Sequence, residues 1–163
     1  MRNHTVELFQ KLFSNYILIA ALSGWLVAQI IKAILHLVVT GEFQIERLFG
    51  DGGMPSCHSA TVCALATATG LGCGVDSSHF ALAFVFATIV INDAMGVRRE
   101  TGRQAKVINE MMDLFKEMGK SGKNMSAQET LKELVGHTPL QVLVGATIGI
   151  IVALAESPFF PIH

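Results

Sequence analysis

The residues best suited to chemistry in this chain are cationic or imidazole side chains at the ends of apolar segments. His58 and His137 each precede or open a segment predicted to be helical, and Lys32 interrupts a long apolar run. Arg99 and Arg103 follow another apolar run at a spacing of four residues, so one helix face could present both to one ligand. Together with the free backbone N–H groups of helix N-termini, these side chains favour an anion, above all phosphate.

The two histidines stand at turns that also have purely structural explanations. Residues 55–58 (Pro-Ser-Cys-His) enter an apolar segment, where free N–H groups and the positive helix end favour a phosphate oxygen. A capped helix start without a ligand explains the same residues as well. His137 lies between Gly136, which could close one helix, and Thr138-Pro139, which could open the next. A simple junction residue is the alternative there.

The charged candidates also have structural alternatives. Arg98, Arg99 and Arg103 could each be a juxtamembrane anchor that contacts lipid headgroups. Lys32 lies in an apolar run, where an ionisable group is costly and tends to mark function, although a lysine near a helix end can also reach the interface. Asp93 is a natural partner for Lys32 or an arginine, and a structural salt bridge is its simpler role.

The composition indicates a membrane protein. Hydrophobic residues make up 51% of the 163 residues and charged residues 15%, against roughly 45–50% and about 25% in soluble domains. The net charge of −1 and the single Trp and Tyr exclude nucleic-acid binding as a working hypothesis. The three cysteines have no CxxC spacing, so neither a zinc site nor a disulfide framework is expected. We expect no metal and no cofactor.

The apolar pattern predicts an all-α fold, an integral membrane helical bundle of about four transmembrane helices in one domain, 1–163. A cytoplasmic helical segment is expected over 102–135, with an amphipathic helix at 102–118, a loop at 119–125 and a short capped helix at 126–135. The predicted spans are residues 16–39, 59–75, 80–97 and 139–160.

Four spans place the loops after the first and third spans on one side of the membrane, opposite both termini. This topology brings together residues 52–60, 92–104 and 136–141, which are far apart in the sequence. The same side carries most of the Lys and Arg residues, so the positive-inside rule predicts that it is cytoplasmic. Small residues recur every four positions in the second and fourth spans, which predicts close helix packing and also allows a homodimer.

Four segments, in this order and spacing, resemble the divergent branch of the type-2 phosphatidic acid phosphatase superfamily, which is related to vanadium-dependent haloperoxidases. The resemblance covers nearly the whole chain. It implies hydrolysis of a phosphate monoester through a phosphohistidine. The segments are GGMPSCHSA (52–60), DAMGVRRETGRQA (93–105), VIN (107–109) and ELVGHTPLQVLVGATIGI (133–150).

The resemblance implies specific roles for individual residues. His137 matches the nucleophile, His58 the general acid and Ser56 the phosphate-binding serine. In these roles His137 would attack phosphorus and His58 would protonate the leaving alkoxide. The equatorial phosphate oxygens would be held by helix N-termini and by cationic side chains. The phosphate-binding candidates are Lys32, Ser56, Cys57, Arg98, Arg99 and Arg103, with Asp93 in support.

The chain departs from the superfamily pattern at three positions. Gln141 stands where a carboxylate orients the nucleophilic histidine, and an amide oxygen accepts a hydrogen bond without stabilising an imidazolium by charge. Cys57 replaces a glycine, and Leu131 stands where an arginine is expected six residues before His137. The phosphate-holding arginine is therefore left to the cluster at 98–103.

The leading hypothesis is a metal-independent membrane phosphatase for a lipid or isoprenoid phosphate, whose headgroup lies at the cytoplasmic face among membrane lipids. The alternative is a catalytically weak or inactive protein that binds phospholipid headgroups or a protein partner, which Gln141 favours. A small transporter with Lys32 and Asp93 as a relay is a third possibility, but no pair of interrupted spans supports it.

Overall fold

The computed structural model describes residues 2–41, 53–117, 131 and 136–160. Within these ranges the secondary structure is entirely helical, so the prediction of an all-α membrane bundle is confirmed. The helices are α1 (Arg2–Phe13), α2 (Tyr16–Thr40), α4 (Cys57–Cys73), α5 (Ser78–Met95), α6 (Val97–Glu117) and α7 (Pro139–Glu156), followed by the short 3₁₀ turn η1 (Ser157–Phe159).

Four of these helices begin with a side-chain cap. In each, an oxygen of the N-cap side chain accepts a hydrogen bond from a backbone N–H in the first turn, which satisfies one donor that has no partner within the helix. The caps and donors are Asn15 and Leu18, Ser56 and Ser59, Ser77 and Phe80, and Thr138 and Gln141. The caps fix where α2, α4, α5 and α7 begin.

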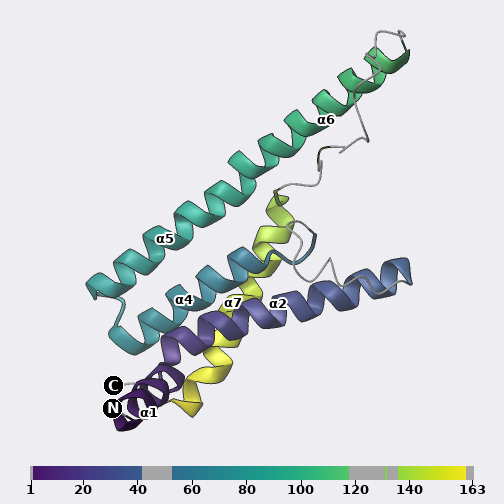
Figure 1. Cartoon of the computed structure of the whole chain (residues 1–163). Helices are drawn as coiled ribbons and strands as arrows, with labels where there is room; N and C mark the ends of the chain where they lie inside the picture. The colour runs from purple at the N-terminus through teal and green to yellow at the C-terminus, as the bar shows by residue number, and fades with distance from the viewer. Residues whose placement is uncertain (1, 42–52, 118–130, 132–135, 161–163) are drawn as a thin grey trace.

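The helix α4 lies at the centre of the bundle and contacts α2, α5 and α7 (Figure 1). Its small residues allow the close approach: a Cβ atom added at Gly24 of α2 would lie 2.9 Å from the Cβ of Ala64, and one added at Gly149 of α7 would overlap the carbonyl oxygen of Ala60. The predicted small-residue faces of the second and fourth spans thus pack against neighbours within one chain. The predicted homodimer is untested. The small-residue faces that suggested it already pack against helices of the same chain.

Among the described residues, three segments are long and apolar enough to cross a membrane. They are Tyr16–Thr40, the α5–α6 segment Ser78–Leu114, and Pro139–Phe159. The fourth bundle helix, α4, has 17 residues and is therefore about 26 Å long, slightly less than the roughly 30 Å of a bilayer's hydrocarbon core. Large apolar side chains such as Leu82 and Ile89 on α5 are exposed, as expected where a helix faces lipid.

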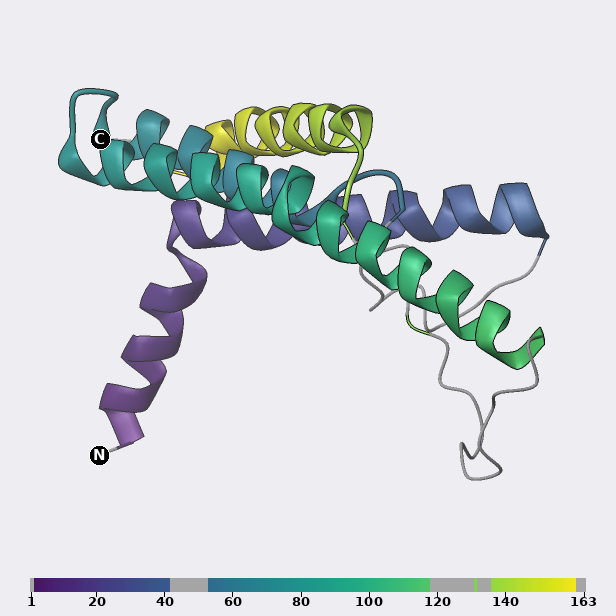
Figure 2. The ribbon, with the colours of Figure 1, turned by 90° about the horizontal axis from the view of Figure 1, so that it is seen from above.

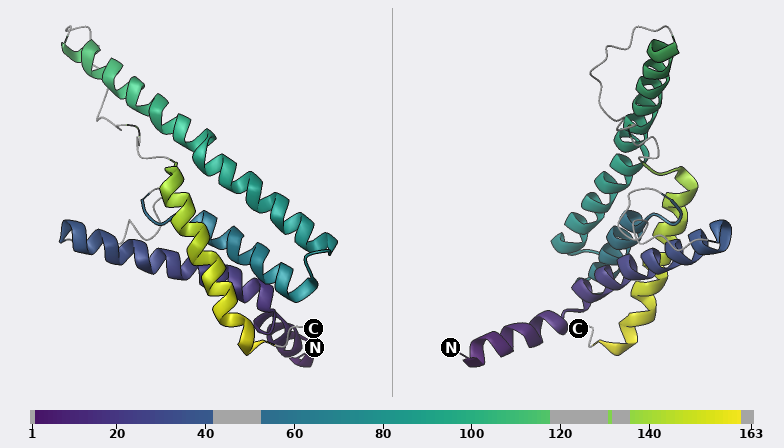
Figure 3. Two further views of the ribbon diagram at one scale, coloured as in Figure 1. Left: turned by 180° about the vertical axis from the view of Figure 1, so that it is seen from behind. Right: turned by 45° about the vertical axis from the view of Figure 1, so that its right-hand side comes forward.

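The amphipathic helix predicted at 102–118 begins five residues earlier, at Val97. It follows α5 with an interruption at Gly96 alone; the two helices look collinear in Figure 1, whereas Figure 2 and the right-hand view of Figure 3 show a bend between them. The N–H of Gly96 still bonds to the carbonyl of Asn92, and the N–H of Glu100 to that of Gly96. The helical ladder thus crosses the junction, and Arg98 and Arg99, which follow the predicted third span, lie in the first turn of α6.

A helix that the sequence did not predict precedes the bundle. It is α1, which leaves the start of α2 at a steep angle (Figure 2). The predicted loop at 119–125 and helix at 126–135 lie outside the described residues except for Leu131. The backbone N–H of Leu131 donates to the side-chain oxygen of Asn109 (3.1 Å) and its carbonyl accepts from the Asn109 amide (3.0 Å). These bonds tie this residue to the middle of α6.

Candidate functional site

Three helix ends meet at one end of the bundle. The backbone N–H of Ser56, before α4, donates to the carbonyl of Gln141 in the first turn of α7 at 3.1 Å. The N–H of His137, just before α7, donates to the carbonyl of Ala94 at the end of α5 at 3.0 Å. The predicted convergence of the turns around 56, 94 and 137 is therefore present.

Gly136 makes the approach between α7 and the α5–α6 junction possible. Its φ of +94° lies in the left-handed region, which a residue with a Cβ adopts only at a cost. A Cβ at this position would also overlap the backbone of Arg98 and Arg99. The absence of a side chain thus lets the turn press against α6 and fixes His137 beside the end of α5.

The two candidate catalytic histidines are neighbours. The ring centroids of His58 and His137 are 6.1 Å apart and the rings are inclined by 55°. The His137 side chain is almost fully buried, whereas His58, in the first turn of α4, is half-buried. The two imidazoles therefore lie close enough together to belong to one site.

Gln141 contacts His137 in the manner expected of an orienting residue. Its side-chain oxygen Oε1 accepts a hydrogen bond from the backbone N–H of Thr138 at 2.9 Å and lies 3.4 Å from Nδ1 of His137. Since Oε1 is an acceptor, it favours the tautomer with a proton on Nδ1, in which the ring lone pair lies on Nε2. The capping box with Thr138 holds the amide in this position.

Lys32, which belongs to α2, lies beside the start of α4. Its side chain is 5% exposed, and its Nζ lies 3.8 Å from the sulfur of Cys57, which is also buried. A Cβ added at Gly53 would lie 3.9 Å from the aliphatic stem of Lys32, so the chain before α4 passes close to that stem. The ammonium group therefore lies at the start of α4, beside the sulfur of Cys57.

Ser56 is placed as a structural cap. It is fully buried, and its Oγ accepts hydrogen bonds from the Ser59 N–H at 3.3 Å and the Ser59 hydroxyl at 3.0 Å. A hydroxyl has two acceptor sites and one donor, so only the hydrogen of Ser56 is left for an anion. In this arrangement its main contribution is to hold the first turn of α4.

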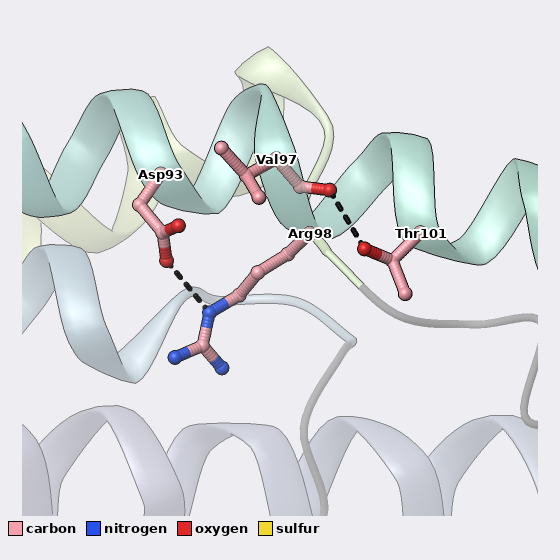
Figure 4. A network of polar contacts seen from close by, with 4 residues as sticks. All are labelled: Asp93, Val97, Arg98 and Thr101. Atoms are coloured by element: carbon pink, nitrogen blue, oxygen red, sulfur yellow. Dashed lines mark hydrogen bonds and ion pairs between the residues drawn. The ribbon is translucent and has the colours of Figure 1, made fainter.

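The arginines are placed differently from one another. The Nε of Arg98 donates a hydrogen bond to the Asp93 carboxylate at 2.8 Å, and both side chains of this ion pair are about 40% exposed. Figure 4 shows the Arg98 side chain beside Asp93. Asp93 thus pairs with an arginine, as the sequence suggested. Arg103 pairs with Glu100 of its own helix at 3.4 Å and is well exposed. Arg99 has an exposed side chain, and its backbone contacts Gly136.

Three buried polar residues in the described part of the chain, Gln29, Ser59 and Thr69, were not singled out from the sequence. Gln29 is 6% exposed and lies one turn before Lys32 on α2, and Ser59 is fully buried beside Ser56. Gln29 could have been found from the sequence, because it is a polar residue within a long apolar run. Ser59 carried no such signal, because a serine in the first turn of a helix is common.

The fold and the site together define a helical membrane protein with two adjacent imidazoles, a buried lysine and an arginine pair at one end of the bundle. The sequence matches the Divergent PAP2 family over residues 13–152, and the chain belongs to that family.

A bacterial relative supports the same classification. The "Uncharacterized membrane protein YuiD" of Bacillus subtilis (strain 168) is 38% identical over 156 residues, which cover 92% of this chain and 99% of that protein. The match thus extends over nearly the whole length of both proteins. No solved structure matches the chain.

Proposed function

We propose that this protein is a metal-independent membrane phosphatase that hydrolyses a lipid or isoprenoid phosphate monoester through a phosphohistidine. The observation that carries the proposal is the pair His58 and His137, whose rings are 6.1 Å apart where three helix ends meet. Membership of the Divergent PAP2 family supports it.

In the proposed reaction, Nε2 of His137 attacks phosphorus while Gln141 holds the Nδ1 proton. The bond from phosphorus to the leaving oxygen breaks, and His58 donates a proton to the alkoxide. Water then attacks the phosphohistidine, with His58 as the base, and releases inorganic phosphate. Lys32 and the α4 N-terminus balance charge on the non-bridging oxygens.

The test is phosphate release from a panel of lipid and isoprenoid phosphates in detergent. His137→Ala and His58→Ala should each lower the rate by about 10²-fold or more, since each removes a reacting group. The matched control is His79→Ala, an exposed histidine near the start of α5. Equal rates in all three variants and the parent would refute the assignment.

A second candidate function is binding of phospholipid headgroups or a protein partner without turnover. The specific observation is Gln141, a neutral amide 3.4 Å from His137 where the related phosphatases carry a carboxylate. Saturable binding of a lipid phosphate that depends on His58 and His137, with no phosphate released over many hours, would select this function.

We further propose a multi-pass topology with the site at the cytoplasmic face. Cys73 ends α4 at the side opposite the site and is exposed, whereas Thr101 lies on α6 beyond the site. An impermeant maleimide added to intact cells should label Cys73 but not Thr101→Cys. The reverse labelling pattern would invert the topology.

A further inference from the structure

The sulfur of Cys57 lies where the groups expected to bind an anion converge. The Nζ of Lys32 is 3.8 Å from Sγ, and the side chain and backbone of His58 also interact with this sulfur through hydrogen bonds. Cys57 is the first residue of α4, so its sulfur lies at the positive end of the helix. Both Cys57 and Lys32 are about 95% buried, as their exposed fractions of 5% show.

This environment is the one that activates a thiol. A nearby ammonium group, a histidine and a helix N-terminus all stabilise the thiolate, which is the reactive form of cysteine. The other two cysteines lie in different surroundings. Cys63 lies within α4, and Cys73 is exposed at the end of α4 that is far from Lys32 and His58. The convergence of a cation, an imidazole and a thiol therefore distinguishes Cys57.

We propose that Cys57 is a redox modification site that controls anion binding by the candidate site, an inference that rests on the proposed function for its physiological meaning. A hydroperoxide is the oxidant. The Cys57 thiolate attacks the terminal oxygen of the hydroperoxide, the O–O bond breaks, an S–O bond forms, and the alkoxide or hydroxide that leaves takes the proton of the new sulfenic acid. The sulfur is oxidised to a sulfenate, and the peroxide is reduced to an alcohol or water.

The sulfenate competes with phosphate for the same groups. Its negative oxygen is bound to the sulfur that Lys32 and His58 already contact, so an oxidised Cys57 occupies the donors that a phosphate needs. A small thiol reverses the change: it displaces water from the sulfenic acid to give a mixed disulfide, and a second thiol then releases the Cys57 thiol and a small disulfide. The site is blocked under oxidising conditions and restored under reducing ones.

The experiment measures the rate of sulfenic acid formation at each cysteine. The full-length protein in detergent is treated with dilute hydrogen peroxide and a dimedone-type trap, and peptides containing Cys57, Cys63 and Cys73 are quantified by mass spectrometry. Cys57 should react about three- to tenfold faster than Cys73 despite its burial, because an ordinary thiol is only a few per cent thiolate at neutral pH. Inorganic phosphate should slow the reaction at Cys57 and leave that at Cys73 unchanged.

Two variants at one position separate charge from packing. Lys32→Met should reduce the rate at Cys57 to that of Cys73, and Lys32→Arg should retain most of it. A rate at Cys57 that does not exceed the rate at Cys73, or that phosphate leaves unchanged in the parent protein, would overturn the proposal even if Lys32→Met fails to fold. Because trapping needs no turnover, fast and phosphate-sensitive oxidation without any phosphatase activity would refute the proposed hydrolysis and keep this inference.

Discussion

The substitution Gln141→Glu tests the role of the orienting residue. Glutamate keeps the acceptor oxygen that now receives the Thr138 N–H at 2.9 Å and lies 3.4 Å from Nδ1 of His137. It adds a negative charge beside the ring that becomes positive as its other nitrogen attacks phosphorus. We therefore expect faster turnover with little change in substrate affinity, since the charge develops in the transition state.

The size of the effect follows from the distance. Two unit charges about 4 Å apart attract each other by about 4 kcal/mol at an effective dielectric constant near 20. Part of this is lost because the carboxylate must be partly desolvated beside a buried ring. A net gain of about 1.4–2.7 kcal/mol corresponds to a roughly ten- to hundredfold increase in kcat.

The assay is phosphate release under saturating and limiting lipid phosphate, so that kcat and KM are obtained separately. Gln141→Leu is the matched control, because it removes the acceptor without adding charge and should lower kcat below that of the parent. The double variant with His137→Ala should abolish the gain. If the parent releases phosphate readily and Gln141→Glu releases less while its thermal unfolding is unchanged, the orienting role of Gln141 is wrong.

Three further predictions concern the framework of the site. Gly136→Ala should lower the melting temperature and reduce phosphate binding, because φ is +94° and a Cβ would overlap the α6 backbone. The left-handed geometry alone costs about 1–2 kcal/mol. Unaltered binding would contradict the close contact between Gly136 and α6. Gly149→Leu should destabilise the bundle in detergent, since α7 there contacts the Ala60 carbonyl, and a melting curve like that of the parent would count against this packing. Tyr16→Phe removes the 2.7 Å bond to the Ala153 carbonyl and should cost about 1 kcal/mol without changing phosphate binding at the opposite end; a loss of binding would show that the two ends are coupled.

Much of the framework could be predicted because it depends on local sequence. The four-residue recurrence that includes Gly145 and Gly149 predicted a close-packed face, and the structure places this face against α4. The Thr138-Pro139 pair predicted the start of α7 at the correct residue. The convergence of His58 and His137 followed from topology alone, since alternate loops of a helical bundle share an end.

Other features depend on contacts between distant residues and could not be predicted. Gly136 looked like the end of a helix, but its absent side chain matters because Arg98 and Arg99 pass directly against it. The start of α6 was missed because Gly96 and the charged residues after it look like a loop, while the continuous backbone ladder keeps them helical. The contact between Lys32 and Cys57 joins residues 25 positions apart, and no local pattern encodes it.

Gly96 is the single interruption between α5 and α6, so it is the natural pivot for any motion of α6 relative to the bundle. The α6 arm has 21 residues and is therefore about 31 Å long, whereas Arg98 and Arg99 stand within one turn of the pivot at Gly96. If the arm swings by about 10°, its tip moves by about 5 Å while residues a few ångströms from the pivot move by less than about 1 Å. A displacement of that size at the distal end of α6 would therefore move the backbone of Arg98 and Arg99, which lies against Gly136, by less than about 1 Å.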